Sequence, residues 1–435
     1  MRAAPYARRW RSYRERCGWE AALVDTTMKA EVRSVTTSKL VFDPFSEEHY
    51  DDPYETYRRL RDEAPVYYSE QYDFYALSRH EDVAPAFKDF ATFSSSRGVT
   101  LEEIQYGDHK HDQSIIWMDP PSHRRMRSLV NKVFTPRAIT AQTAVVHERI
   151  EHHLAKVDPN RFDVVAEFSA LFPVEVITTM LGVPEEHQQQ VRLWLDVALK
   201  RRPGQMRMAR AGIDAMTQTG LMYYNLIQQR RADPQDDMIS ALIAAEVDRE
   251  DGTRTSLDDV EISGFCTLLG GAGAETVAKW VGTAMVLFSR HPEQWQALRA
   301  DRSKIPAAVE EVLRHEGPVQ YDCRYTMADV HAHGTTIPAG SAVMLLGAAA
   351  NRDERAFTNA DTFDIDRDRG EAQNLAFGYG IHSCLGAALA RMESAIALDH
   401  LLDFMPEFEV EYDLLTRVAM TSVNGYENVP VKVQR

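Results

Sequence analysis

Apolar residues recur at helical spacing through most of the chain between about residues 120 and 315. A period of 3.6 residues predicts helices, and prolines end or bend them. One apolar segment, from about 257 to 287, is long enough for a single long helix, with Ser256 and Asp259 as its predicted capping pair. The prolines that divide the rest of this stretch are Pro136, Pro173, Pro184, Pro203 and Pro234.

Short β-prone runs flank the helical stretch on both sides. They occupy residues 66–68, 74–77, 324–327, 342–346 and 407–431. The first two surround a polar turn and predict a hairpin, which follows a helix over 53–60. A last long helix is expected near 385–404. Mostly helix with small sheets near both ends predicts an α+β fold that is mainly α.

The 435 residues include 65 acidic and 49 basic ones, which gives a formal net charge of −16. This charge disfavours nucleic acid as a partner, because nucleic-acid binding requires a basic surface. No apolar run approaches the roughly 20 residues of a membrane-spanning helix. The four cysteines form no CxxC pair, which is typical of thiols in a reducing compartment and predicts a cytoplasmic protein.

Residues 1–27 differ from the rest of the chain in composition. They contain six arginines against three acidic residues, and they lack the apolar segment of a secretory signal. We expect either that translation begins at Met28, so that this basic extension is non-native, or that the extension is disordered. No internal repeat or Gly/Ser linker follows, so residues 28–435 are expected to form a single domain.

The run from Phe377 to Gly386, FGYGIHSCLG, places Cys384 where the predicted last helix begins. Free amides and the positive end of the helix dipole lower the pKa of a thiol at such a position. A thiolate of this kind suits the axial ligand of a haem iron, and Gly386 leaves room for a flat macrocycle. The residues alone also allow a buried structural cysteine, or a Cys–His nucleophile formed with His382, although a spacing of two gives poor geometry.

The same run resembles the haem-binding signature FGxGxHxCxG of the cytochrome P450 superfamily. The match falls on Phe377, Gly378, Gly380, His382, Cys384 and Gly386. The resemblance extends over about 42–431 and points to the bacterial, ferredoxin-dependent type. It implies haem b with Cys384 as the iron ligand. It also implies a large helical domain with small sheets near both ends and the haem between two long helices.

A second motif lies inside the predicted long helix, at Ala272-Gly273-Ala274-Glu275-Thr276. Adjacent Glu and Thr in an apolar helix are costly unless they are used. Threonine can bond back to a carbonyl and loosen the helix locally. The sequence is similar to the AGx(D/E)T acid–alcohol pair of the family, so the resemblance implies that Glu275 and Thr276 relay protons to dioxygen. The alternative is a polar patch on a core helix.

Glu311 and Arg314 are spaced to share one helix face, and by themselves they indicate only a surface ion pair. Together they resemble the ExxR motif of the family, with Arg367 as the third member of a buried structural triad behind the cysteine loop. His123 and Arg127 share a face in the same way, on a helix that Asp119 is predicted to cap.

A haem carries two carboxylates and therefore needs cations in its site. The resemblance assigns His123, Arg127, Arg324 and His382 as the partners of the propionates. It also implies substrate contacts from the loop 97–116, from Gly270, Gly271 and Ala272, from Val319–Asp322 and from Ser422–Asn424. The small residues at 270–272 would form a wall suited to a bulky or long lipophilic guest such as a terpenoid, steroid or fatty acid. Polar contacts from His111 or Gln113 would weaken that preference.

The function implied is reductive activation of dioxygen, followed by hydroxylation or epoxidation of a lipophilic small molecule. With no reductase domain expected, electrons would come from a separate ferredoxin and its NAD(P)H-dependent reductase. Arg124, Arg125 and Lys132 form a candidate basic docking face, or simply a solvated helix face. A peroxide-driven hydroxylase and a non-catalytic recruiting or carrier protein are the alternatives, and retention of Cys384, Glu275 and Thr276 argues against both. The run His109-Lys110-His111 is read as a solvated loop tip rather than a metal site.

Overall fold

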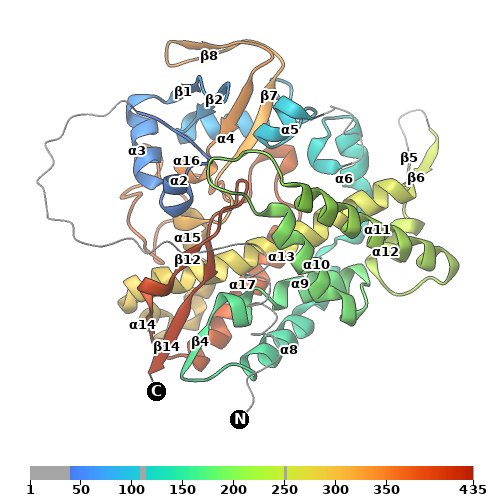
Figure 1. Cartoon of the computed structure of the whole chain (residues 1–435), viewed down its shortest axis with the longest axis vertical. Coiled ribbons are helices and arrows are strands. Elements are labelled where there is room, and N and C mark those ends of the chain that lie inside the picture. The colour runs from blue at the N-terminus through green and yellow to red at the C-terminus, as the bar shows by residue number, and fades with distance from the viewer. Residues whose placement is uncertain (1–39, 108–113, 249–251, 435) are drawn as a thin grey trace, which may run out of the picture. The chain divides into compact units, whose positions relative to one another are not determined.

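A computed structural model describes residues 40–107, 114–248 and 252–434 (Figure 1). Its longest helix, α13 (Asp259–Arg290), crosses the middle of the helical region and packs against α9 (Phe172–Leu181), α11 (Arg210–Ala232) and α17 (Ala387–Phe404). Most side chains of α13 from Ile262 onward are buried. A helix that is apolar on all sides belongs in a core, so α13 organises the helices around it.

The start of α13 differs from the predicted capping pair. The Asp258 carboxylate accepts hydrogen bonds from the amides of Val260 and Glu261, and the Glu261 carboxylate accepts one from the amide of Asp258. This capping box leaves no role for Ser256, while the Asp259 side chain bonds Arg231 of α11 instead. The helix therefore begins where a carboxylate reaches two free amides, two residues after the predicted serine.

The other helices follow the predicted order along the chain. They are α2 (Glu47–Asp51), α3 (Tyr54–Glu63), α4 (His80–Lys88), α5 (Leu101–Tyr106), α6 (Ser122–Val133), α7 (Pro136–Ala141), α8 (Thr143–Leu154), α10 (Glu185–Leu199), α12 (Met238–Ala244), α14 (Pro292–Ala300), α15 (Ile305–Glu316) and α16 (Gly347–Ala350). Short helical turns lie at η1 (Ile115–Trp117), η2 (Val165–Ser169), η3 (Arg302–Lys304), η4 (Gly380–His382) and η5 (Tyr412–Leu414).

The main sheet combines strands from residues 66–94 with strands from residues 322–345. Its strand order is β1-β2-β10-β7-β3. The predicted hairpin is present, with β1 (Val66–Ser69) antiparallel to β2 (Phe74–Leu77). Strand β10 (Ala342–Leu345) lies parallel to β2 and antiparallel to β7 (Asp322–Thr326). All four residues of β10 are buried, as expected for a central strand covered on both faces.

The remaining strands are short. Strand β3 is at the edge of the main sheet, and the others form smaller sheets. They are β3 (Phe93–Ser94), β4 (Arg161–Asp163), β5 (Glu246–Asp248), β6 (Arg254–Ser256), β8 (Val330–Ala332), β9 (Thr335–Ile337), β11 (Glu407–Val410), β12 (Thr416–Arg417), β13 (Tyr426–Asn428) and β14 (Pro430–Gln434). The β-like end of the chain is thus divided between the sheets β11-β14-β4 and β12-β13. The predicted α+β, mainly helical fold is confirmed.

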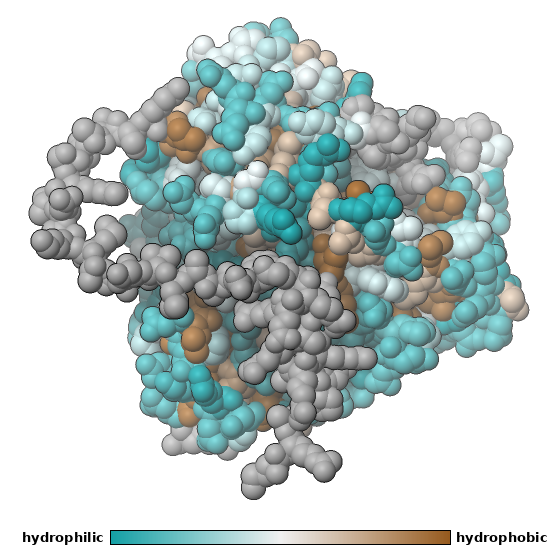
Figure 2. Space-filling model, viewed as in Figure 1, coloured by the Kyte–Doolittle hydropathy of each residue, from teal (hydrophilic) through white to brown (hydrophobic). Residues whose placement is uncertain are grey.

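The surface is mostly polar on the face drawn in Figure 2, where hydrophobic areas are small and separate. Scattered exposed apolar side chains are normal for a folded protein. Within the described ranges, no single helix has the length and apolar character needed to cross a membrane; only the stretch Val165–Leu181 taken with Glu185–Leu199 does, and it bends by 119° at the break. Residues 1–27, the boundary at Met28 and Cys17 lie outside the described residues, so those predictions stay untested.

A buried ion network ties α15 to the loop that precedes the cysteine. Arg314 donates to both carboxylate oxygens of Glu311 at 2.7 and 2.8 Å, and Arg367 approaches the same carboxylate at 3.3 Å. Arg314 also donates to the carbonyl of Asn351, whose side-chain oxygen accepts from the amide of Leu375. The predicted triad is therefore assembled, and one residue connects it to the segment leading into Phe377.

Breaking this network should destabilise the protein strongly. Arg314→Ala leaves the Glu311 carboxylate buried without its bidentate partner, which costs about 3–5 kcal/mol of unfolding free energy. The measurement is urea unfolding followed by circular dichroism. Arg58→Ala is the matched control, because Glu55 and Arg58 of α3 have the same spacing and the same 2.7 Å distance but are exposed. Equal losses in the two variants would contradict a structural role for the buried pair.

Candidate active site

The cysteine loop is closed by backbone contacts before α17 begins. The Cys384 amide donates to the carbonyl of Phe377 at 2.9 Å, and α17 starts at Ala387 with Gly386 as its N-cap. Gly380 has φ +78°, and a Cβ there would lie 2.7 Å from the carbonyl oxygen of Phe87 in α4. Only glycine fits that approach, so the second glycine of the signature sets how the loop sits against α4.

The thiol of Cys384 is exposed although protein surrounds it. Desolvation raises its pKa, while the amides of Gly386 and Ala387 and the charges of Arg127 and Arg391 lower it less. The start of α17 therefore lowers the pKa of the thiol as predicted, but desolvation raises it by more in the protein alone. A coordinating metal deprotonates a thiol outright, so the exposed sulfur fits an iron ligand.

Four basic side chains gather at this loop from three different segments. The rings of His123 in α6 and His382 in η4 are 4.5 Å apart. Arg127 of α6 donates to the carbonyl of Ser383 at 3.0 Å, and Arg324 of β7 lies over the ring of Phe87. The structure thus brings together all four residues that the resemblance assigned to the propionates.

This cluster lacks an anion. Among the described residues, no carboxylate forms an ion pair with Arg127 or Arg324, and the buried Nε2 atoms of His123 and His382 have no hydrogen-bond partner there. Desolvation, Arg324 and His123 lower the pKa of His382 to about 3, and desolvation with Arg127 lowers the pKa of His123. Buried bases without counter-charge are costly, so the cluster fits a group that brings two carboxylates, as haem does.

The start of α6 differs from its prediction. Asp119 does not cap the helix; its carboxylate accepts from the hydroxyl of Ser94 and the amide of Ser95. The carbonyl of Asp119 instead accepts from the amide of His123. Asp119 therefore anchors α6 to β3, which keeps His123 directed into the cluster.

The middle of α13 shows two different sides. Ala272 is exposed, and the Thr276 hydroxyl donates to its carbonyl at 2.9 Å, which is the predicted back-bond. Glu275 is buried, with its carboxylate 3.3 Å from Lys279 Nζ. Adjacent helical residues point about 100° apart, so the acid and the alcohol face different surroundings.

The predicted glycine wall requires correction. Gly270 is buried, and a Cβ there would collide with the hydroxyl of Tyr223 in α11. A Cβ on Gly271 would lie 3.0 Å from Leu195 of α10. These glycines let helices approach α13, so the expectation that Gly270 lines the substrate pocket is wrong, and Gly271 is explained by packing. Ala272 alone among the three is exposed.

Two predicted substrate segments lie side by side. Val319 is partly buried and forms an isolated bridge with Val423, and the amide of Gln320 donates to the carbonyl of Ser422 at 2.8 Å. The 97–116 loop is described only in part. His109, Lys110, His111 and Gln113 lie outside the described residues, so their predicted roles stay untested.

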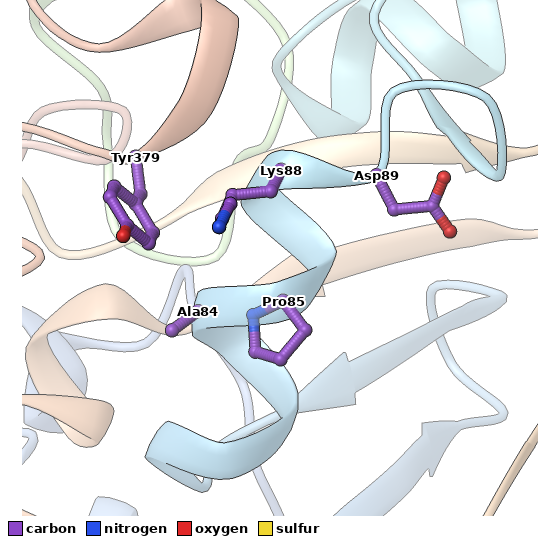
Figure 3. A pocket seen from close by; sticks show the side chains of 5 residues that line it. All are labelled: Ala84, Pro85, Lys88, Asp89 and Tyr379. Atoms are coloured by element: carbon purple, nitrogen blue, oxygen red, sulfur yellow. The ribbon is translucent and has the colours of Figure 1, made fainter.

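Two hollows open on the outer side of the cysteine loop. One, of about 370 Å³, is lined by Ala84, Pro85, Lys88, Asp89 and Tyr379, with Lys88 Nζ 5.1 Å from the centre of the Tyr379 ring (Figure 3). The other, of about 500 Å³, lies along α6 and includes Arg124, Lys132 and Ile381.

The predicted docking face on α6 is partly engaged within the protein. Arg125 pairs with Glu261 at 2.5 Å, and Lys132 donates to the carbonyl of Glu246 at 2.5 Å. Arg124 is exposed. The basic face that remains available is therefore narrower than the sequence indicated.

A family model described as cytochrome P450 matches residues 185–424. A putative cytochrome P450 123 of Mycobacterium tuberculosis is 39% identical over 398 residues, which cover 91% of this chain and 98% of that protein. The chain belongs to the cytochrome P450 family. It is accordingly an oxidoreductase, a haem-iron monooxygenase that uses dioxygen on a small molecule.

Three further P450 relatives differ in what they bind. The vitamin D(3) 25-hydroxylase of Pseudonocardia autotrophica is 36% identical and aligns over 91% of this chain and 97% of its own length. CYP109E1 from Bacillus megaterium in complex with corticosterone superposes with a TM-score of 0.77, 31% identity and coverage of 89% and 99%. P450BioI in complex with an acyl carrier protein bearing hexadec-9Z-enoic acid gives a TM-score of 0.79, 31% identity and coverage of 89% and 99%.

The sequence analysis missed two polar residues near the α13 motif. Lys279 stands one turn after Glu275, a spacing that is visible in the sequence. Asp196 of α10 lies within hydrogen-bonding reach of Glu275, and no local pattern links residues 79 positions apart. Only the packing of α10 on α13 reveals that second carboxyl group.

Loss of a cation from the base cluster should weaken haem retention. Arg127→Leu removes a guanidinium that has no carboxylate partner among the described residues, so we expect at least a several-fold lower haem-to-protein ratio after gel filtration, with the helix unchanged. Arg124→Leu is the control on the same helix, since Arg124 is exposed. Equal haem content in both variants would exclude Arg127 as a propionate partner.

Proposed function

We propose that this chain binds haem b through Cys384 and hydroxylates or epoxidises a lipophilic small molecule such as a terpenoid, steroid or fatty acid. The observation that carries the proposal is the exposed Cys384 thiol beside four bases that lack an anion. A soft ligand and two anion sites, side by side, are what an iron porphyrin with two propionates requires.

When bound, haem supplies the activation of dioxygen. The chain supplies the site around it. Cys384 would ligate the iron, and Arg127, Arg324, His123 and His382 would hold the propionates. The glycines at 378, 380 and 386 with Phe377 would hold the loop that presents the sulfur, and Glu311, Arg314 and Arg367 would fix that loop from behind.

The acid and the alcohol of α13 would manage the proton. The Thr276 hydroxyl donates its hydrogen bond to the Ala272 carbonyl. The lone pairs of its oxygen therefore stay free to accept a hydrogen bond, for example from a water, on the exposed side. Glu275 would hold a proton on its buried carboxyl group. This arrangement supports dioxygen as the oxidant over peroxide, because a peroxide-driven hydroxylase needs no such delivery of protons.

The substrate class rests on apolar surroundings and on relatives. Ala272 is exposed on α13 and Val319 is partly buried where it bridges Val423, and both offer apolar contacts. Three relatives act on or bind vitamin D(3), corticosterone and a carrier-bound fatty acid. Together these support a steroid-like or acyl guest, free or held on a carrier.

Electrons would come from a ferredoxin and its NAD(P)H-dependent reductase. The hollows beside the cysteine loop offer Arg124 and Lys88 as exposed cations near Cys384, which supports docking of an acidic electron carrier there. A cytoplasmic location stays a prediction from the cysteine usage.

Replacing the axial cysteine should change the optical spectrum. We expect Cys384→Ser to lose the thiolate-type spectrum of the ferric haem protein, because a hydroxyl donates far less electron density to iron. Cys266→Ala, which removes a buried thiol of α13, should keep it. A spectrum unchanged by Cys384→Ser would refute the proposed ligand.

Optical titration should identify the guest. Adding corticosterone, a monoterpenoid or palmitate to the ferric protein should shift the iron from low to high spin for at least one lipophilic class, because such a guest displaces water from the iron. The readout is the change in the Soret band with concentration. If none of the three produces a shift, a free lipophilic substrate is excluded.

A further inference from the structure

Helices α10 and α13 bring a second carboxyl group next to the acid of the proposed acid–alcohol pair. The carboxyl group of Asp196 in α10 lies within hydrogen-bonding reach of that of Glu275 in α13. Each carboxyl group also has its own cation one turn away on the same helix. Arg192 lies 2.9 Å from Asp196, and Lys279 lies 3.3 Å from Glu275. The two carboxyl groups therefore lie between two cations at the contact between the helices.

Two carboxyl groups in contact share a proton rather than ionising together. Desolvation and the Glu275 carboxylate raise the pKa of Asp196 to about 8, against the opposing effects of Arg192 and Lys279. At neutral pH the shared proton therefore resides on Asp196, which donates its hydrogen bond to Glu275.

The two carboxyl groups differ in their access to water. Glu275 and Lys279 are each only 4% exposed, whereas the Asp196 side chain is 38% exposed. A proton from solvent can therefore reach Asp196 directly. Glu275 has no comparable opening of its own, so its contact with Asp196 is a route to it from outside.

We propose that Asp196 is the residue that reprotonates Glu275 during turnover. The inference rests on the proposed role of Glu275. The Asp196 hydroxyl proton passes to the Glu275 carboxylate, which leaves Asp196 as a carboxylate held by Arg192 and Glu275 as a neutral acid. Water then returns a proton to Asp196. Asp196 acts through Glu275, so it is a positioning residue for the proton.

The chain contains a matched control for the local ion pair. Arg210 and Asp214 of α11 have the same spacing and the same 2.9 Å distance as Arg192 and Asp196, but they are exposed and contact no second carboxylate in the described residues. Asp214→Asn therefore removes an equivalent helix pair without touching the shared proton. Asp196→Glu keeps the carboxyl group.

The first test is an infrared pH titration of the holoenzyme between pH 5 and 10. The wild type should show a protonated-carboxyl C=O band that disappears with a midpoint near the pKa of about 8. Asp196→Asn should abolish this band and Asp214→Asn should retain it. Absence of the band from the wild type, or its persistence in Asp196→Asn, overturns the proposal without reference to activity.

The second test follows the proton itself. Dithionite-reduced holoenzyme is mixed with oxygenated buffer in H2O and in D2O, and the return to the ferric spectrum is timed from pH 6 to 9. The wild-type rate should fall above pH 8, where Asp196 has lost its proton, and should be slower in D2O. Asp196→Asn should be about 10-fold to 100-fold slower, with a flat pH profile; Asp196→Glu should restore the slope, and Asp214→Asn should match wild type.

Glu275→Gln distinguishes a failure of the role assigned to Asp196 from a failure of the role proposed for Glu275. If Glu275→Gln slows the reaction but Asp196→Asn does not, Glu275 keeps its proposed role and the assignment of Asp196 is overturned. If neither substitution changes the rate or the isotope effect, the proposed role of Glu275 fails as well.

Discussion

The buried Glu311 carboxylate is the interaction on which the site depends most. It pairs with Arg314 and Arg367 in the interior, and Arg314 in turn donates to the carbonyl of Asn351. The Asn351 side chain then fixes the amide of Leu375, just before Phe377. A loop that must present a sulfur atom in one place needs such support, because its glycine-rich backbone supplies little rigidity of its own.

The interior leaves charge uncompensated in one place and compensates it in another. Beside Cys384, cations from α6 and β7 have no described carboxylate partner, which fits a site completed by a dianionic group. Where α10 meets α13, two acids (Asp196 and Glu275) are matched by two cations (Arg192 and Lys279). The first arrangement fits an anionic group. The second holds a proton, because protonating one of two neighbouring carboxylates removes the repulsion between them.

Helix α13 places its acid and its alcohol in different surroundings. Its exposed side carries Ala272 and the Thr276 hydroxyl, while its buried side carries Glu275 and meets α10. Gly270 and Gly271 allow Tyr223 and Leu195 to approach the helix closely. Close packing of α10 and α11 is thus the condition for contact between Asp196 and Glu275, so the glycines contribute to the site through helix packing.

The sequence by itself determined the features that depend on near neighbours. The cysteine loop, the Thr276 back-bond, the hairpin at β1 and β2 and the buried run of β10 all follow from residues within a few positions of one another. The tertiary structure decided what depends on distant segments. It moved the α13 cap to Asp258, turned Gly270 toward Tyr223, raised the pKa of the Cys384 thiol by desolvation and set Asp196 against Glu275. Burial and charge pairing sum over all surrounding elements, and a local pattern contains no information about which elements those are.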